Sequence, residues 1–293
     1  MADQAADSIQ QESDRSEGYT VVARRYRPKS FDELVGQDTV AQGLMRAIET
    51  DRVGHAYLFT GARGVGKTTS ARIFAKMLNA SNDHSGHFNP ESEVAKAIDA
   101  GDDMDVIEID GASNNGVEEI RVLRSNVSVR PTRGKYKIYI IDEVHMLTNN
   151  AFNALLKTLE EPPEHVKFIF CTTEPDKLPA TVLSRCQRFD FPPVKLDLIF
   201  GRLKLICEKE GIQAEEAALK MVARLAQGSM RDSQSLLEQL VSFSDGKISV
   251  DHIHTMFGMA DETRLALLVE CMVNRDAGKI LRELDLAIAA GID

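Results

Sequence analysis

The sequence has no closely spaced cysteines and no long apolar run. Its four cysteines lie far apart, without a Cys-x-x-Cys pair, at Cys171, Cys186, Cys207 and Cys271. This spacing indicates neither a metal site nor a disulfide framework, so we expect free thiols in a reducing compartment. No stretch approaches the roughly 18 to 20 apolar residues of a membrane helix, and the N-terminus is acidic where a signal peptide would be basic. We therefore expect a cytoplasmic protein without a membrane partner.

Basic residues are in the minority, with 35 Lys and Arg against 45 Asp and Glu and a formal net charge of -10. This excess of acid argues at first against a nucleic-acid partner, because phosphate contacts need Lys and Arg. The acidic residues, however, are concentrated in residues 1–18 and 91–119. Residues 120–137 carry six basic residues and no acidic one. That stretch is a candidate basic face, and an ordinary solvated surface is the alternative.

The order of apolar and amphipathic segments predicts an α/β domain. Residues 1–18 are polar and lack apolar periodicity, so we expect a disordered leader. From Tyr19 onward, apolar runs alternate with amphipathic stretches, an order that implies a parallel sheet covered by helices. The four apolar runs that predict strands are residues 55–60, 105–110, 137–141 and 166–171.

The second half of the chain has a helical pattern. After Phe191 the strand-like runs stop, and residues 196–257 contain several amphipathic segments, among them 214–226 and 230–242. The last 35 residues keep a helical period but end without a capping signal, as if cut inside a third helical unit. We therefore expect an α/β domain over 19–194, a small helical domain over 195–258 and the start of another helical domain over 259–293.

A phosphate-binding motif occupies residues 61–68, with the sequence GARGVGKT. It lies between a predicted strand and a helix predicted over 67–78, the context that separates a P-loop from a chance match. In such a loop the backbone N–H groups wrap the phosphates. Lys67 is then expected to contact the β- and γ-phosphates, and the Thr68 hydroxyl to bind Mg²⁺. The alternative is a glycine-rich turn with a purely structural role.

Two carboxylates end the strand predicted over 137–141. The carboxyl ends of parallel strands meet at one sheet edge, so Asp142 and Glu143 are expected beside the P-loop. Asp142 is then placed to hold Mg²⁺ through water, and Glu143 to orient and deprotonate the attacking water. Acidic residues also commonly start helices, so the pair gains its meaning from the P-loop. Together the two motifs predict ATP hydrolysis.

Three further polar residues are candidates for the same chemistry. Thr173 closes the fourth predicted strand and could touch the γ-phosphate, although β propensity alone explains a threonine there. Arg185 follows a predicted helix and could be an arginine finger for a neighbouring subunit, or a surface salt bridge. Arg231 starts a predicted helix that Ser229 can cap, and it could reach the phosphates if the helical domain folds over them.

From Tyr19 to about Asp293 the chain resembles the gamma/tau subunits of bacterial DNA polymerase III clamp loaders. The resemblance rests on ARRYRP with VGQ, on GARGVGKTT, on IDEVHMLTNNAFNALLKTLEEPPEHVKFIF, on LSRC and on GSMRD. It implies an AAA+ P-loop domain with a parallel five-stranded sheet, followed by a small helical lid domain and the start of a helical collar domain.

The resemblance also implies roles for individual residues. Thr173 matches the sensor 1 position, Arg185 the finger that acts on the adjacent subunit's ATP, and Arg231 sensor 2. The implied catalytic residues are Lys67, Glu143, Thr173 and Arg185, and the implied Mg²⁺ ligands are Thr68 and Asp142. The implied nucleotide contacts are Pro28, Val35, Gly61, Gly64, Val65, Gly66, Lys67, Thr68, Thr69 and Arg231.

One segment departs from the family pattern. Familiar members carry a four-cysteine zinc module between the P-loop helix and the second strand, whereas residues 79–104 contain no cysteine. His84 and His87 are too few to hold zinc, even with Met104 nearby. We therefore expect ATP and Mg²⁺ but no zinc, and a segment held by a helix over 94–98 or partly disordered over 81–90.

The resemblance implies an ATP-driven clamp-loader subunit that helps open a sliding clamp and place it on primed DNA. The implied partners are other clamp-loader subunits in a hetero-pentamer, the clamp, primed DNA, and polymerase and helicase through regions beyond residue 293. One alternative is a nucleotide-binding scaffold that links replisome partners. The other is a different AAA+ motor, such as a branch-migration helicase.

Overall fold

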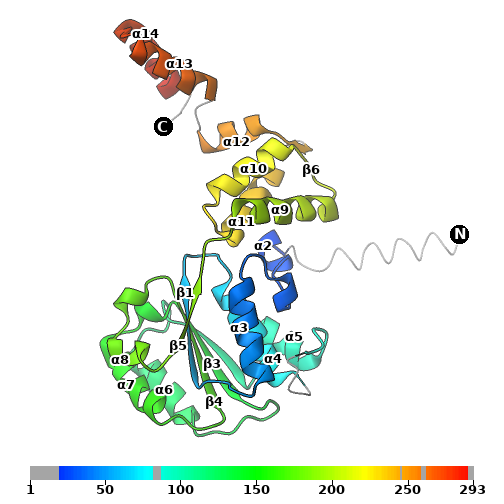
Figure 1. Ribbon diagram of the computed structural model, residues 1–293, viewed down its shortest axis with the longest axis vertical. Coiled ribbons are helices and arrows are strands. Elements are labelled where there is room, and N and C mark those ends of the chain that lie inside the picture. Colours follow the sequence, from blue (N-terminus) through cyan, green and yellow to red (C-terminus); the bar gives the residue numbers. More distant parts are fainter. Residues whose placement is uncertain (1–19, 82–86, 245, 259–261, 290–293) are drawn as a thin grey trace, which may run out of the picture.

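The computed structural model describes residues 20–81, 87–244, 246–258 and 262–289. The leader expected over 1–18 lies outside these residues. Residues 82–86, part of the segment 81–90 for which we considered partial disorder, also lie outside them. An α/β unit, a small helical unit and a final pair of helices follow one another along the long axis of the molecule (Figure 1). The domain boundaries given above stay predictions.

Five parallel strands form the central sheet in the order β2-β3-β4-β1-β5, which confirms the expected five-stranded parallel sheet. The apolar pattern located four of them to within about a residue. It missed β5, because this edge strand has largely exposed side chains and therefore no apolar run. The strands are β1 (Ala56–Gly61), β2 (Val106–Asp110), β3 (Lys137–Asp142), β4 (Val166–Thr172) and β5 (Gln187–Phe191).

Helices cover both faces of this sheet, as the near-continuous burial of its central strands requires (Figure 1). Successive β1 residues alternate between two cores, so Phe59 packs on one face and Leu58 on the other. One face carries α3 (Asp38–Glu49), α4 (Lys67–Asn79) and α5 (Glu93–Ala100), and the other α6 (Val117–Asn126), α7 (Asn149–Glu160) and α8 (Ala180–Leu183). The short helices are α2 (Val22–Arg25), η1 (Phe31–Glu33), η2 (Val144–Met146) and η3 (Pro175–Lys177).

The helical unit packs around its own core, which also takes in Val22 of α2 from the start of the described chain. The predicted helices are confirmed. One of them begins later than expected, because residues 213–214 pair in parallel with a second short strand. The elements are α9 (Leu196–Glu210), β6 (Gln213–Ala214), α10 (Glu216–Leu225), α11 (Met230–Phe243), β7 (Lys247–Ile248) and α12 (Val250–Phe257).

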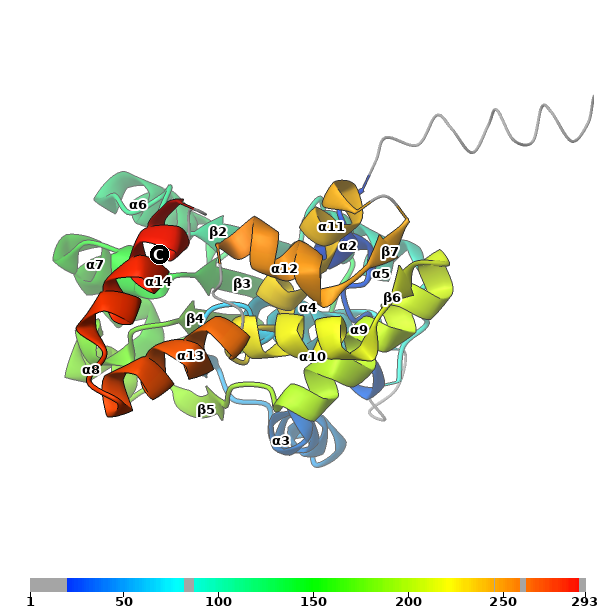
Figure 2. The same ribbon diagram turned by 90° about the horizontal axis from the view of Figure 1, so that it is seen from above.

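The last two helices, α13 (Glu262–Val273) and α14 (Ala277–Ala289), pack against each other. Both lie at the end of the molecule farthest from the sheet, and in the second view they project over its α7 and α8 side (Figures 1 and 2). No helix in the described ranges has the length and apolar content needed to cross a membrane. All four cysteines are free thiols.

A buried aspartate fixes the loop that leads into β3. Asp105 is 2% exposed, and its carboxylate accepts the backbone N–H groups of Thr132, Arg133 and Gly134 at 2.7–3.0 Å. Burial by itself raises the pKa of this carboxyl group, but the three N–H donors and nearby Lys137 bring the pKa below its usual value. The charged form is therefore the one that the fold stabilises.

We expect Asp105→Asn to lower the free energy of unfolding by about 2–4 kcal/mol. The NH₂ group of asparagine would take the place of one carboxylate oxygen and would face backbone N–H groups, which are also donors. Since the pKa of Asp105 is depressed, its stabilisation is present above the usual value of about 3.9 and is lost as pH falls through the lower folded value. Urea unfolding at pH 7 and below pH 4 measures both effects. Asp102→Asn, at an exposed position of the same segment, is the matched control. Equal stability of the two variants at pH 7 would contradict this prediction.

Candidate nucleotide-binding site

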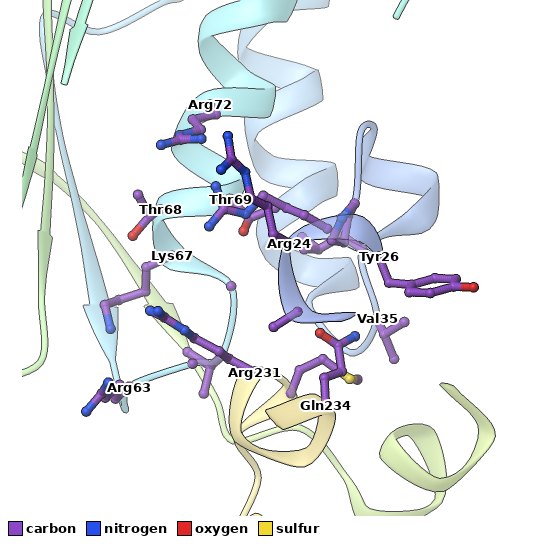
Figure 3. A pocket seen from close by; sticks show the side chains of 18 of the residues that line it. Arg24, Tyr26, Val35, Arg63, Lys67, Thr68, Thr69, Arg72, Arg231 and Gln234 are labelled. Atoms are coloured by element: carbon purple, nitrogen blue, oxygen red, sulfur yellow. The ribbon is translucent and has the colours of Figure 1, made fainter. Parts of the chain in front are cut away.

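A cavity of about 470 Å³ lies between the α/β unit and the helical unit, within the range typical of ligand sites. Several parts of the chain enclose it: the N-terminal segment with α2, the P-loop with α4, and helices α9 and α11 (Figure 3), together with the ends of α5 and β3. The predicted site residues that line it are Pro28, Val35, Gly64, Val65, Gly66, Lys67, Thr68, Thr69, Asp142, Glu143 and Arg231. Gly61, Thr173 and Arg185 are not in the lining.

The P-loop owes its shape to glycines with positive φ. Gly61, Gly64 and Gly66 have φ angles of 146°, 74° and 109°, a region that side-chain-bearing residues rarely adopt. Helix α4 begins at Lys67 directly after the last of them, so its first N–H groups face the cavity. A helix N-terminus of this kind binds phosphate through unpaired N–H donors and the positive end of the helix dipole.

Lys67 is 6% exposed, and its ammonium group donates to the carbonyl oxygens of Gly61 and Ala62, each at 2.9 Å. Burial lowers its pKa, an effect that the nearby carboxylates of Glu143 and Asp142 oppose. The loop therefore holds a cation among its own carbonyl groups, next to the helix N-terminus. Both features suit a phosphate group.

Thr68 and Asp142, the two residues predicted to bind Mg²⁺, lie side by side. The hydroxyl of Thr68 donates to Asp142 Oδ2 at 2.5 Å, although the two residues come from α4 and the end of β3. Mg²⁺ prefers hard oxygen ligands and keeps several of its waters. A hydroxyl and a carboxylate at the phosphate end of the cavity fit that ion.

Glu143 and Thr173 also meet, since the threonine hydroxyl donates to Glu143 Oε2 at 3.2 Å. Thr173 directly follows β4, and Glu143 follows β3, the strand beside it. The structure thus brings a predicted base and a predicted sensor together at one sheet edge. Sequence reasoning missed their neighbour His145, whose ring is 3.5 Å from Glu143 Oε2; its place two residues after a candidate base was the available signal.

The start of α11 is bonded to the P-loop. Its N-terminus is capped by Ser229, as predicted, whose side chain accepts the N–H of Asp232 at 3.1 Å. The backbone N–H of Arg231 donates to the carbonyl of Gly64 at 3.3 Å. The Arg231 side chain extends from α11 into the cavity near Lys67 (Figure 3). The helical unit therefore covers the phosphate loop as the sequence-based hypothesis required.

The cavity has a strong excess of positive charge, with seven cationic side chains in its lining against three acidic ones. Arg27 is so placed that burial and the neighbouring Arg72 lower its pKa. In a chain of net charge -10, such a concentration favours a polyanionic ligand. Five of the cationic residues were not predicted, although three arginines in residues 24–27 were a signal; they are Arg24, Arg27, Arg63, Arg72 and Arg202.

Arg185 lies outside this cavity, after α8. Its guanidinium group bonds Glu160 Oε1 at 2.8 Å and the carbonyl of Thr181 at 2.7 Å. Glu160 ends α7, so the arginine is held on the outer surface of the α/β unit. In this structure Arg185 therefore does not contribute to the cavity of its own chain.

The segment between α4 and β2 contains α5, which confirms the helix expected over 94–98. Lys76 of α4 is fully buried and bonds both carboxylate oxygens of Asp99, at 2.9 and 3.0 Å. His84 lies outside the described residues, so the absence of zinc stays a prediction. The basic stretch over 120–137 is not one exposed face, because Lys137 is buried and Lys135 forms an ion pair with Asp51.

We expect Gly64→Ala to weaken ATP binding by at least about tenfold, because relief of the strain of a side chain at positive φ, about 1–2 kcal/mol, would here reshape the phosphate loop itself. The added Cβ would also lie 2.0 Å from Ser229 Oγ and push α11 away from the loop. Titration with a fluorescent ATP analogue measures the affinity. Gly211→Ala is the matched control, because its φ of 68° carries a similar strain with no atom within 4 Å of the new Cβ. Equal ATP affinities of the two variants would contradict the proposed contact.

Two family models match the chain. The model described as "DNA polymerase III, delta subunit" covers residues 36–195. The model described as "DNA polymerase III clamp loader subunit, ATPase lid domain" covers residues 198–246. The second match coincides with the helical unit from α9 to α11.

Similar sequences come from several bacteria. The chain is 44% identical to DNA polymerase III subunit tau of Escherichia coli and 45% identical to that of Bacillus subtilis, in each case over 94% of this chain. It spans 43% and 49% of the length of these two relatives. It is 39% identical to DNA polymerase III subunit gamma of Buchnera aphidicola, over 94% of this chain and 76% of the relative.

Solved structures of Thermotoga maritima RuvB share the fold. One, described as a Holliday junction branch migration motor, has a TM-score of 0.58 at 18% identity, covering 85% of this chain and 80% of the other. Another structure of the same protein, a point variant, has a TM-score of 0.59 at 19% identity, covering 92% of this chain and 86% of the other. At such identities the likeness concerns the AAA+ fold alone.

Proposed function

The chain belongs to the gamma/tau subunit family of DNA polymerase III, and from this premise we propose that it is an ATP-hydrolysing subunit of a clamp loader. One observation carries the proposal. Thr68 of the P-loop and the acidic pair Asp142 and Glu143 after β3 come from two separate motifs and lie together at the phosphate end of one cation-lined cavity. A site that only stored nucleotide would not need a carboxylate beside the metal ligands.

In the proposed reaction, the P-loop N–H groups and Lys67 hold the β- and γ-phosphates. Thr68 and Asp142 hold Mg²⁺, which when bound neutralises charge on the phosphate oxygens. Glu143 accepts the proton of the attacking water, and Thr173 keeps its carboxylate oriented by the hydrogen bond at 3.2 Å. Pro28 and Val35 line the cavity on the side of the N-terminal segment, where we place the adenine.

Arg231 and Arg185 would make the site responsive to assembly. Arg231 lies on the helix that closes the cavity, so contact with the phosphates favours the closed position of the helical unit. Arg185 would stabilise transition-state charge in the site of an adjacent subunit. ATP then biases the arrangement of subunits through contacts that differ between the open and closed states.

We propose that the partners are other clamp-loader subunits in a hetero-pentamer, the sliding clamp and primed DNA. Polymerase and helicase would bind through regions that this chain does not contain, since it spans under half of the tau subunits it matches. The cytoplasm is the compartment in which these partners and reduced cysteines occur. We propose further that no zinc is bound, and one equivalent of zinc per purified chain would contradict this.

Two other functions are less compatible with the chain. A scaffold that binds nucleotide only for stability would have no need of Lys67, Glu143 and Arg185 together, and all three are present. A branch-migration motor is suggested by the RuvB likeness, which is only 18–19% identical, against 39–45% for the polymerase III subunits.

ATP turnover of the assembled chain, measured with and without the clamp and primed DNA, tests the proposal. We expect strong stimulation by clamp and primed DNA together, because both complete the closed arrangement of subunits. Turnover that is indifferent to both would favour the scaffold. Stimulation by branched DNA without the clamp would favour the branch-migration motor.

A further inference from the structure

The backbone at Glu143 is held in an unusual conformation. Its φ of 43° is rare for a residue with a side chain. The conformation is fixed from both sides: the N–H of Glu143 donates to Asp142 Oδ1 at 2.9 Å, and its carbonyl accepts the N–H of Met146 at 2.9 Å. Val144 is fully buried and anchors η2 in the core. The turn therefore places His145 at a defined point beside the end of β4.

His145 lies between Glu143 and the residues that follow β4. Only 6% of its side chain is exposed. Its Nδ1 is 3.0 Å from Thr172 Oγ1 and 3.5 Å from Glu143 Oε2, and its Nε2 is 3.3 Å from Glu174 Oε1. One ring thus spans the distance between a candidate base and the loop on which Thr173 lies.

Polar groups from two residues hold this ring at both of its nitrogens. Nδ1 is within hydrogen-bond distance of the Thr172 hydroxyl, and Nε2 lies 3.3 Å from a carboxylate oxygen of Glu174. Thr172 Oγ1 also accepts the backbone N–H of Glu174 at 3.0 Å, and its hydroxyl can act as donor or acceptor toward Nδ1. Thr172, Glu174 and His145 thus form a closed cycle of polar contacts, two of them hydrogen bonds and the third a contact between Nε2 and the Glu174 carboxylate. This cycle ties His145 to the end of β4.

We propose that His145 is a positioning residue for ATP hydrolysis. By bonding Thr172 through Nδ1 and contacting the Glu174 carboxylate through Nε2, it holds the end of β4 so that the Thr173 hydroxyl aligns the carboxylate of Glu143. The same Nδ1 lies 3.5 Å from Glu143 Oε2, so the ring also limits how far that carboxylate can turn away from Thr173. The inference rests on the proposed function, because a positioned base matters only if ATP is hydrolysed.

Three substitutions distinguish the contribution of the Nδ1 contact from that of the Nε2 contact. His145→Ala removes both contacts, His145→Asn keeps an amide near the place of Nδ1, and His145→Gln keeps one near the place of Nε2. The alignment of Thr173 depends on the Thr172 contact, so Asn should restore function and Gln should not. His165→Asn is the control, since this ring bonds the carbonyl of Val127 at 3.1 Å, at the opposite end of β4.

The experiment measures kcat and the ATP dissociation constant of the assembled clamp loader containing each variant. We expect His145→Ala to lower kcat by roughly 10- to 100-fold, because small displacements of a catalytic group have effects of that size. The dissociation constant should stay within about twofold, since the ring does not line the cavity. His145→Asn should recover kcat to within about fivefold of the wild type, because its amide can bond the Thr172 hydroxyl. The control should keep the wild-type kcat.

Three results would overturn the inference while the wild type remains active and responsive to clamp and DNA. These are an unchanged kcat in His145→Ala, recovery by Gln but not by Asn, or a fall in ATP affinity or melting temperature that accounts for the loss of activity. A wild-type complex without ATP turnover would overturn both the inference and the proposed function. A wild-type complex that hydrolyses ATP but ignores clamp and DNA would overturn the proposed loader alone.

Discussion

Replacing Arg185 by alanine is expected to reduce ATP hydrolysis at the adjacent subunit's site in the assembled complex by about 10³- to 10⁵-fold, the contribution of an arginine finger that acts in trans. Binding of ATP to the isolated chain should not change, because Arg185 lies outside the cavity lining and is bonded to Glu160 and Thr181. Turnover is measured in complexes in which only this chain carries the substitution. The affected site should be that of its neighbour.

The matched control is Arg188→Ala, which removes an exposed arginine paired with Asp190 at 2.7 Å. An exposed ion pair of this kind contributes little to stability, so both turnover and binding should stay at wild-type levels. Two results would show that Arg185 is an ordinary surface residue: full activity of Arg185→Ala in the complex, or the same modest loss in both variants. Weaker ATP binding by the isolated Arg185→Ala chain would place the arginine at its own site.

Replacing Glu143 by glutamine should lower kcat by about 10²- to 10⁴-fold, the usual contribution of a general base. The amide has nearly the shape of the carboxylate and can still accept the hydrogen bond of Thr173, but it cannot take a proton from water. ATP affinity should therefore remain close to that of the wild type. Single-turnover hydrolysis of bound ATP measures the chemical step separately from binding and release.

Glu216→Gln serves as the control for this substitution, because it neutralises an exposed glutamate of the helical unit that is paired with Lys204 at 3.0 Å. It should leave kcat unchanged. Normal hydrolysis by Glu143→Gln would remove Glu143 as the base. A Glu143→Gln chain that fails to bind ATP would instead show that the carboxylate is needed to form the cavity.

Local apolar patterns predicted less of the fold than the family resemblance did. Central strands such as β3 were predictable because both faces are buried, which forces a continuous apolar run. The edge strand β5 has no such run, and its existence followed from family resemblance alone. In the same way, the start of α10 depended on pairing of residues 213–214 with 247–248, which no local pattern contains.

Within the site, the sequence motifs predicted which residues are involved but not which of them contact one another. The contacts of Thr68 with Asp142 and of Thr173 with Glu143 join residues 74 and 30 positions apart. The parallel order of β3, β4 and β1 brings these strand ends to one edge. His145 was missed because its place after the acidic pair is only a weak signal until its neighbours from the end of β4 are known.

By itself the sequence determined the phosphate loop, the acidic pair, the strand and helix alternation and the family, because these depend on local spacing and backbone preference. Only the tertiary structure decided that Arg24, Arg27 and Arg72 line one cavity with Lys67. It also decided that the backbone N–H of Arg231 donates to the carbonyl of Gly64. Finally, it decided that Arg185 lies outside the lining of this cavity and bonds Glu160. The reason is physical: a cavity's charge and an arginine's partner depend on distances between segments remote in the chain, which only the packing of the sheet and the helical unit sets.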